Sequence, residues 1–217
     1  GYVQTKTAKL DFEVGVAAEH RWEFPEGRGN GPSAWETSEW VSKQRLSVHL
    51  EAGETLGFTK RVAVLSTLHA SSKELKDRAY AVLQEVRHQS HEELGMEQAK
   101  AWESMWEQAD IQIDGDIKAQ QGIRFNIFHL HQTYNGLDHR LNIGPKGFTG
   151  EKYGGSTYWD TEAYCIPFYL GTAPGRVARQ LLEYRYRQLD KAIANAGKLG
   201  FKDGAALFPM VTMNGEE

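Results

Sequence analysis

A glycine-rich loop leads directly into a group of side chains with the chemistry of a sugar-binding site. Residues 147–156 read GFTGEKYGGS, and they deliver Tyr158, Trp159, Asp160 and Glu162 to the start of a predicted helix. Glycine adopts backbone conformations that other residues avoid, so such a loop can turn sharply. A tryptophan ring can cover the apolar face of a pyranose, and a carboxylate beside it can accept hydrogen bonds from the hydroxyls. Trp159 and Asp160 are therefore candidate sugar-binding residues.

The same residues also have a purely structural interpretation. Thr157 and Asp160 are of types that cap helices, and Trp159 is of a type that fills cores. Residue chemistry alone leaves both interpretations open. A P-loop for phosphate is a poor match, because the stretch lacks the Gly-Lys-Ser/Thr ending of that motif.

A second candidate is the acidic pair Glu216 and Glu217, which follows the stretch MVTMNG. A carboxylic acid on a loop can protonate a departing glycosidic oxygen when its surroundings raise its pKa. The alternative is a pair of exposed acids on a surface loop. These residues therefore qualify as a general acid only if other features point to the same chemistry.

Histidine and cysteine supply no further candidate. His129 and His131 lie two positions apart on a predicted helix, and residues at that spacing do not share a helix face. We therefore predict packing or hydrogen-bonding roles for them and no metal site. Cys165 lies in the apolar, aromatic setting EAYCIPF and is predicted to be a packing residue, not a nucleophile. A single cysteine cannot form an internal disulfide, which fits a reducing, cytoplasmic compartment.

The composition is typical of a soluble globular protein. The 217 residues are 40% hydrophobic and 25% charged, with a formal net charge of −4. An acidic balance argues against nucleic acid as a main partner. No apolar run approaches the roughly 20 residues that a membrane span requires. We therefore expect neither nucleic acid nor a membrane as a partner.

The period of the hydrophobic pattern changes near residue 70. Before that point, apolar and polar residues alternate over 10–16 and again over 46–50, and a further apolar stretch runs from Leu56 to Leu65. Alternation is typical of half-buried strands. Residues 1–68 are therefore predicted to be mainly antiparallel β-structure, with a Gly- and Pro-rich loop over 25–32 and a turn over 52–54.

After residue 70 the apolar residues recur with a helical period. Helices are predicted around 75–86, 99–106, 123–134 and 160–170 and, as one continuous helix, over 174–197, with a glycine-studded loop over 136–157. The residues that mark the apolar faces are Leu75, Ala79, Val82 and Val86, then Ile123, Ile127, Leu130 and Tyr134, then Val177, Leu181, Leu189 and Ile193. Residues 116–197 are therefore predicted to be mainly packed helices.

Three long stretches resemble one enzyme family. GFTGEKYGGSTYWDTEAYCIPFYL, VARQLLEYRYRQLDKAIANAGKLGF and GAALFPMVTMNGEE are similar to segments of the glycoside hydrolase family 65 phosphorylases. The resemblance is strong over 116–217 and weak over 1–115. The variants YGGSTYWDTEAYC and FPMVTMNGEE are most similar to those of family members that act on maltose.

The resemblance implies an α+β multidomain fold. Residues 1–68 correspond to the C-terminal part of an antiparallel β-sandwich, 69–115 to a helical linker, and 116–217 to the N-terminal part of an (α/α)6 barrel. The chain is accordingly expected to be an internal, truncated piece of a longer protein and to be inactive alone. Apolar faces around Ile123, Ile127, Val177 or Leu181 are then expected to lie beside surface that further helices cover.

The resemblance also implies a reaction and the residues that perform it. Trp159 and Asp160 match the pair that holds the non-reducing glucose, and Glu217, with Glu216 as the alternative, matches the general acid. The implied activity is that of a glycosyltransferase-type phosphorylase, which converts maltose and inorganic phosphate to β-D-glucose 1-phosphate and D-glucose with inversion. Phosphate is the co-substrate and nucleophile, and we expect no metal or other cofactor. The complete protein is expected to be a homodimer, with its phosphate-binding residues beyond Glu217.

Two alternatives remain at this stage. One is another activity of the family, namely trehalose or kojibiose phosphorolysis or glucoside hydrolysis. An inverting hydrolase needs a second carboxylate about 6.5–9.5 Å from the acid to activate water, whereas phosphate is already an anionic nucleophile. The other alternative is a fragment that binds carbohydrate without turning it over. A phosphate requirement for sugar release would separate phosphorolysis from hydrolysis.

Overall fold

The computed structural model describes residues 1–8, 12–27, 31–32, 34–147, 153 and 155–216. The chain divides into two compact units, Gly1–Leu94 and Gly95–Glu217, each of which is described by itself. Among the described residues, no helix is both long and apolar enough to cross a membrane.

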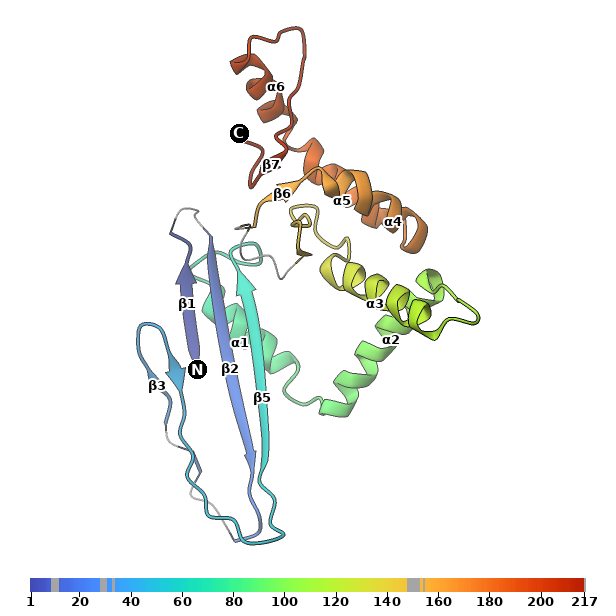
Figure 1. The fold of residues 1–217 in the computed structure, drawn as a ribbon. Helices are drawn as coiled ribbons and strands as arrows, with labels where there is room; N and C mark the ends of the chain where they lie inside the picture. Colours follow the sequence, from blue (N-terminus) through green and yellow to red (C-terminus); the bar gives the residue numbers. More distant parts are fainter. Residues whose placement is uncertain (9–11, 28–30, 33, 148–152, 154, 217) are drawn as a thin grey trace. The chain divides into compact units, whose positions relative to one another are not determined.

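A three-stranded antiparallel sheet forms the first unit (Figure 1). Strand β1 (Tyr2–Lys6) pairs with β2 (Glu13–Glu23), and β2 pairs with β5 (Gly57–Ser66) in a ladder from Val14 opposite Ser66 to Glu23 opposite Gly57. The strand predicted over Leu56–Leu65 is therefore present, and so is the antiparallel character of this region.

Helix α1 (Leu75–Glu85) covers one face of this sheet. Ala17 of β2 lies opposite Ala63 of β5, and both pack with Leu83 of the helix in one buried cluster. Successive residues of a strand point to opposite faces, so Val62 and Val64 lie on the other face, where they are 47% and 61% exposed. The helix thus packs on the small residues Ala17 and Ala63 and not on Val62 and Val64.

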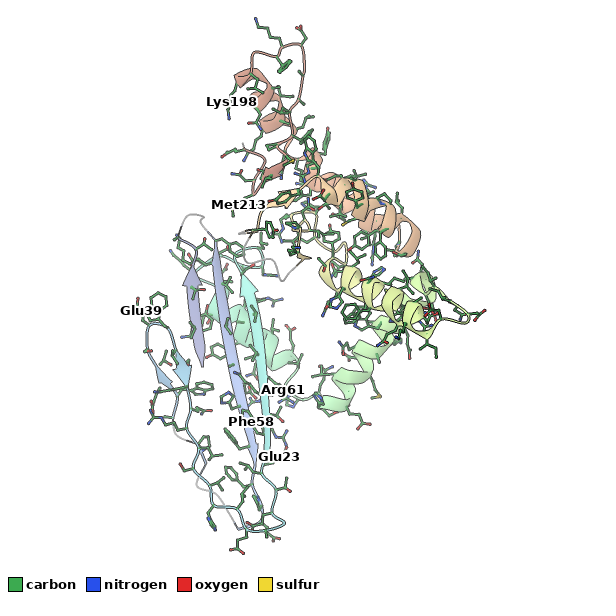
Figure 2. The ribbon with its side chains drawn as sticks, viewed as in Figure 1. Glu23, Glu39, Phe58, Arg61, Lys198 and Met213 are labelled. Atoms are coloured by element: carbon green, nitrogen blue, oxygen red, sulfur yellow. The ribbon has the colours of Figure 1, made fainter. Side chains whose placement is uncertain are left out.

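Figure 2 labels two residues that show the same division of the sheet. Phe58 and Arg61 lie three positions apart on β5, hence on opposite faces. Phe58 stacks on Trp22, its partner on β2, with ring centroids 4.2 Å apart. Arg61, on the face that α1 covers, donates from Nη2 to the carbonyl of Gln89 at 2.9 Å.

The alternation over 46–50 does not produce the expected strand. After β3 (Glu36–Thr37) and β4 (Ser42–Lys43), which pair only with each other, residues 44–50 take part in no sheet. A strand requires a neighbour with which to exchange backbone hydrogen bonds. In the three-stranded sheet, both edges of β2 are already paired, one with β1 and the other with β5. The predicted turn after this segment is found, with Glu54 N donating to Glu51 O at 3.1 Å.

Helices dominate the second unit. They are α2 (His91–Ala109), which begins in the first unit, α3 (Ile117–Thr133), the short π-helix η3 (Thr161–Cys165), which continues into α4 (Ile166–Thr172), α5 (Arg176–Tyr186) and α6 (Leu189–Lys198). Asp116 caps α3, because its side chain accepts a hydrogen bond from Ala119 N at 2.9 Å. The prediction that residues 116–197 are mainly helical is thus confirmed.

The core of the second unit surrounds Tyr169. This side chain is fully buried, and its hydroxyl donates to the carbonyl of Leu130 on α3 at 2.6 Å. Val177 and Leu181 of α5 lie in the same buried cluster. Exposed apolar side chains adjoin buried positions: Phe125 lies two residues before the buried Ile127 on α3, and Leu182 directly follows Leu181. Whether further helices cover that surface stays a prediction, as do the β-sandwich, the (α/α)6 barrel and the domain boundaries at 68 and 115.

The prediction of one continuous helix over 174–197 is wrong. The chain turns at Arg187 and Gln188, so α5 and α6 are separate helices. Neither glycine nor proline stands at this break. Gln188 instead packs closely against Gly215 of the C-terminal segment. The turn also changes which residues face inward on α6: Asn195 is buried, whereas Ile193, expected inside, is 41% exposed.

Candidate functional site

A short antiparallel ladder joins the two stretches that the sequence singled out. Strand β6 (Thr157–Tyr158) pairs with β7 (Val211–Thr212), with Thr157 opposite Thr212 (Figure 1). The hydroxyl of Thr157 also donates to the carbonyl of Thr212 at 3.0 Å, and both residues are buried. The chain just before Trp159 is therefore fixed beside the chain that leads to Glu216.

Trp159 and Asp160 are both exposed at the start of η3. Trp159 is 48% exposed, so the core interpretation of this residue is wrong. Asp160 is exposed at the N-terminus of η3 but makes no capping hydrogen bond through its side chain. Thr157 does not cap either, because its hydroxyl is engaged by Thr212. The indole and the carboxylate are thus both accessible, on consecutive residues.

Asp160 lines a cavity of about 480 Å³ within the second unit. Side chains from α3 and η3 and the loop 143–147 surround it. The polar residues among them include Asn126, His129, Lys146, Tyr158 and Tyr164. A cavity with a few polar groups on an otherwise apolar wall is typical of a small-molecule site. The space is large enough for a monosaccharide unit, but Trp159 is not among the residues that line it.

The turn that leads to Glu216 is built around Thr212. Its hydroxyl oxygen accepts from Gly215 N at 2.8 Å and donates to the carbonyl of Glu216 at 2.8 Å. Gly215 has a φ of 91°, a conformation that side chains with a Cβ rarely adopt. The buried amide of Asn195 on α6 donates to the carbonyl of Gly215 at 3.1 Å. Helix α6 and β7 together therefore fix the direction of the chain at Glu216.

Glu216 is held as a carboxylate. The Nζ atom of Lys191 lies 3.2 Å from Glu216 Oε1 and donates to the carbonyl of Asn214 at 2.9 Å. Hydrogen bonds from Lys191 and Asn214, together with the positive charge of Lys191, lower the pKa of the Glu216 carboxyl. A general acid must carry a proton at the working pH, so these contacts disfavour Glu216 in that role. Glu217, the first choice for the acid, lies outside the described residues.

Arg185 is one of the residues near this site that the sequence did not single out. It is buried, and its guanidinium makes a two-pronged ion pair with Glu162, with Nε at 2.9 Å from Oε1 and Nη2 at 3.1 Å from Oε2. Val177, Leu181 and Arg185 stand at successive intervals of four on α5. An arginine on the buried stripe of a helix was therefore the available signal, because arginine is rarely buried without a partner.

His131 and Cys165 take the packing positions that their settings predicted, whereas His129 is exposed and lines the cavity. His131 stands edge-on to Tyr169, with ring centroids 5.7 Å apart, and burial lowers the pKa of its imidazole. His129 lies against the rings of Phe125 and Phe128. Cys165 packs against the core cluster, and burial raises the pKa of its thiol. In the described parts of the chain, no three His, Cys, Asp or Glu side chains converge as a metal site would require.

Known proteins resemble this chain along nearly its whole length. It is 47% identical over 184 residues to the maltose phosphorylase of Bacillus subtilis (strain 168), a match that covers 85% of this chain and 24% of that protein. It is 34% identical over 221 residues to the α,α-trehalose phosphorylase of Thermoanaerobacter brockii, covering 100% of this chain and 27% of that one. It is also 33% identical over 181 residues to the kojibiose phosphorylase of Halothermothrix orenii (strain H 168 / OCM 544 / DSM 9562), covering 83% of this chain and 23% of that protein. The chain thus spans about a quarter of the length of these relatives.

The fold agrees with the sequence relatives. The solved structure of a putative kojibiose phosphorylase from human microbiome superposes with a TM-score of 0.78 at 31% sequence identity, covering 100% of this chain and 28% of that one. Residues 1–105 match the model of the glycosyl hydrolase family 65 N-terminal domain, and residues 124–217 match that of the glycosyl hydrolase family 65 central catalytic domain. Two domain models of one family, in this order, account for nearly all of the sequence, and the chain belongs to glycoside hydrolase family 65.

Proposed function

We propose that this chain supplies the glucose-binding residues and the general acid of a phosphorylase that cleaves maltose with inversion. The products are β-D-glucose 1-phosphate and D-glucose. The choice of maltose is supported by the 47% identity to the Bacillus subtilis maltose phosphorylase over 85% of the chain. Over stretches of similar length, the identity to trehalose and kojibiose phosphorylases is 34% and 33%.

The pairing of β6 with β7 is the observation that supports this function most strongly. It brings an exposed tryptophan and carboxylate, Trp159 and Asp160, to the same part of the second unit as the turn that ends at Glu216. Cleavage of a glycosidic bond needs these two elements together, a surface that holds the sugar ring and an acid that reaches the bond to be broken. The two stretches are more than 50 residues apart in the chain, and the ladder is what joins them.

The reaction follows from the roles of these groups. Trp159 covers the apolar face of the non-reducing glucose, and Asp160 accepts hydrogen bonds from its hydroxyls. Glu217 donates its proton to the glycosidic oxygen while a phosphate oxygen attacks the anomeric carbon from the opposite face. The bond from that carbon to the leaving glucose breaks as the new bond to phosphate forms. The phosphate monoester then releases its own proton, and the Glu217 carboxylate is reprotonated for the next cycle.

Glu216 has a different role in this proposal. Its contact with Lys191 keeps it ionised and ties it to α6. Glu216 is therefore the partner of Lys191, and the proton comes from its neighbour. This choice between the two acids rests on the lowered pKa of Glu216 and on the match of Glu217 to the family's acid.

The test is sugar release by the whole protein with and without inorganic phosphate. We expect maltose to be cleaved only when phosphate is present, and ³¹P and ¹H NMR to show a β-linked glucose 1-phosphate. Release of two glucose molecules without phosphate would make the protein a hydrolase. Trehalose and kojibiose belong in the same assay, because the chain is 49% identical over 115 residues to the α,α-trehalose phosphorylase of Geobacillus stearothermophilus. A higher kcat/KM for trehalose or kojibiose than for maltose would overturn the choice of maltose but not the proposal of phosphorolysis.

A further inference from the structure

The guanidinium of Arg185 contacts the chain on both sides of Trp159 and Asp160. Its Nη2 atom donates to the carbonyl of Tyr158 at 3.2 Å, one residue before the pair. Its Nε and Nη2 atoms donate to the two carboxylate oxygens of Glu162, two residues after the pair, at 2.9 and 3.1 Å. One side chain on α5 therefore binds the chain at residue 158 and again at residue 162, on either side of residues 159–160.

The pair between Arg185 and Glu162 differs from the surface ion pairs of this chain. The Arg185 side chain is 9% exposed and that of Glu162 is 23% exposed. On the same helix, Arg179 and Glu183 also form an ion pair, but their side chains are 78% and 34% exposed. Exposed pairs are screened by solvent and have weak geometric preferences. A buried, two-pronged pair is fixed in direction as well as distance.

Burial of such a pair is a poor means of stabilising a fold. Removing two charges from water costs much of what their attraction returns, and well-packed neutral residues often serve stability equally well. What the pair does provide is geometry, because a planar guanidinium sets the relative position of every acceptor that it binds. Here those acceptors bracket the two residues to which the proposed function assigns glucose binding.

We propose that Arg185 is a positioning residue for the glucose subsite. Its guanidinium sets the distance between the Tyr158 backbone and the Glu162 carboxylate, and thereby fixes the directions in which Trp159 and Asp160 project. The inference rests on the proposed function, because it takes these two residues as the sugar ligands. Lysine cannot replace the arginine in this role, because an ammonium is a compact charge without the planar fork that fits a carboxylate in two-pronged fashion.

The first test compares Arg185→Lys with Arg179→Lys in the whole protein. A displacement of about 1 Å at a reacting group can lower a rate about 100-fold. We expect Arg185→Lys to lower kcat/KM for maltose by about that factor, while the KM for phosphate changes less than about two-fold. Arg179→Lys, a matched change on the exposed pair of α5, should leave both values as they are. Equal maltose kinetics in the two variants would overturn the inference.

A neutral pair separates positioning from stability. The double variant Arg185→Met with Glu162→Gln removes both charges, so no uncompensated charge stays buried. We expect its melting temperature to stay near that of the parent while kcat/KM for maltose falls as in Arg185→Lys. A merely structural pair predicts the opposite, normal maltose kinetics wherever the melting temperature is normal. That result would also overturn the inference.

Equilibrium binding of glucose distinguishes failure of this inference from failure of the proposed function. The probe is the quenching of tryptophan fluorescence by glucose, and Trp159→Phe identifies the part of the signal that Trp159 contributes. We expect Arg185→Lys to weaken glucose binding at least about ten-fold, with Arg179→Lys unchanged. If the parent binds glucose through Trp159 but no sugar is phosphorolysed, only the proposed function falls. If the parent phosphorolyses maltose and Arg185→Lys binds glucose normally, only the positioning role of Arg185 falls.

Discussion

The hydroxyl of Thr157 donates a hydrogen bond to the carbonyl of Thr212, 55 positions further along the chain, with an oxygen–oxygen distance of 3.0 Å. The backbones of the same two residues are opposite each other in the β6–β7 ladder. Thr212 in turn accepts from Gly215 N and donates to the carbonyl of Glu216. A continuous set of contacts therefore leads from Thr157, just before the residues proposed to bind sugar, to the turn at Gly215 and Glu216.

Replacing Thr157 with valine should weaken this connection without changing the side-chain shape. Thr157→Val keeps the β-branched form but removes the donor to Thr212. A buried hydrogen bond of this kind contributes about 1 kcal/mol to stability. We expect the whole protein to lose about that much in urea or calorimetric unfolding, and kcat for maltose phosphorolysis to fall. Thr157→Ser, which keeps the hydroxyl, should retain most of both. A fully stable and active valine variant would show that the hydroxyl is dispensable.

Gly215 is the position in the acidic turn where a side chain is least tolerated. Its φ of 91° disfavours any residue with a Cβ, and a Cβ would lie 2.9 Å from the Cβ of Gln188. The backbone strain alone costs about 1–2 kcal/mol. Gly215→Ala should therefore lower the unfolding free energy by at least that amount and displace the turn that carries Glu216.

Combining that change with Gln188→Ala provides the control. Both residues would then end at Cβ, so only the contacts with the outer atoms of Gln188 are relieved, at 3.0 and 3.1 Å from the added Cβ. The double variant should recover part of the loss, whereas the strain from the positive φ remains. Calorimetry of the parent, the two single variants and the double variant measures how much unfolding free energy is recovered. Additive effects of the two changes would mean that Gln188 and Gly215 do not act on each other.

The ion pair of Lys191 with Glu216 should affect how the stability of the protein depends on pH. The folded-state pKa of Glu216 is lowered, chiefly by its hydrogen bond with Lys191. A lowered carboxyl pKa contributes stability above the unfolded value near 4.3, and that stability is lost as pH falls through the folded pKa. Lys191→Met should raise the Glu216 pKa towards its ordinary value, as carboxyl ¹³C NMR measures. An unchanged titration would rule out the contact in solution.

The sequence predicts the elements of this structure better than it predicts their partners. Residues 13–16 of the first alternating segment lie in β2, and residues 57–65 of the apolar stretch lie in β5; these parts form strands because each finds a neighbour. The alternation over 46–50 is just as regular but finds none. Likewise, the helical stripe from Val177 to Leu181 is buried as predicted, while the turn at Gln188 depends on Gly215 packing against it. A local pattern contains no information about either partner.

The candidate site shows the same contrast between what the sequence predicts and what it does not. The exposed tryptophan and carboxylate at 159–160 and the acidic pair could be singled out by residue type, and a family resemblance assigned them roles. The pairing of the chain before Trp159 with the chain that leads to Glu216 could not be predicted, because it depends on a two-residue ladder too short to leave a periodic pattern. The buried contact of Arg185 with Glu162 was equally hidden. Only the placement of an arginine on an apolar stripe pointed to it.

The two acids at the end of the chain provide the decisive catalytic comparison. Glu217→Gln keeps the size of the side chain but removes the proton that the leaving glucose requires. General acid catalysis contributes about 10²- to 10⁴-fold, so kcat for maltose phosphorolysis by the whole protein should fall by at least about 100-fold. Glucose binding, read from Trp159 fluorescence, should change little, because the residues that hold the ring are untouched.

Glu216→Gln is the matched control, since it makes the same chemical change one residue earlier. It removes a negative charge from Lys191 but no catalytic proton, so kcat should stay within about ten-fold of the parent. Asp160→Asn should show a third pattern, with both glucose binding and turnover impaired, because contacts to the reacting sugar also help to stabilise the transition state. If Glu216→Gln abolished activity and Glu217→Gln did not, the assignment of the acid would be reversed. If neither change lowered kcat, the general acid would have to lie elsewhere in the protein, because a group that donates the proton in the rate-limiting step cannot be removed without cost.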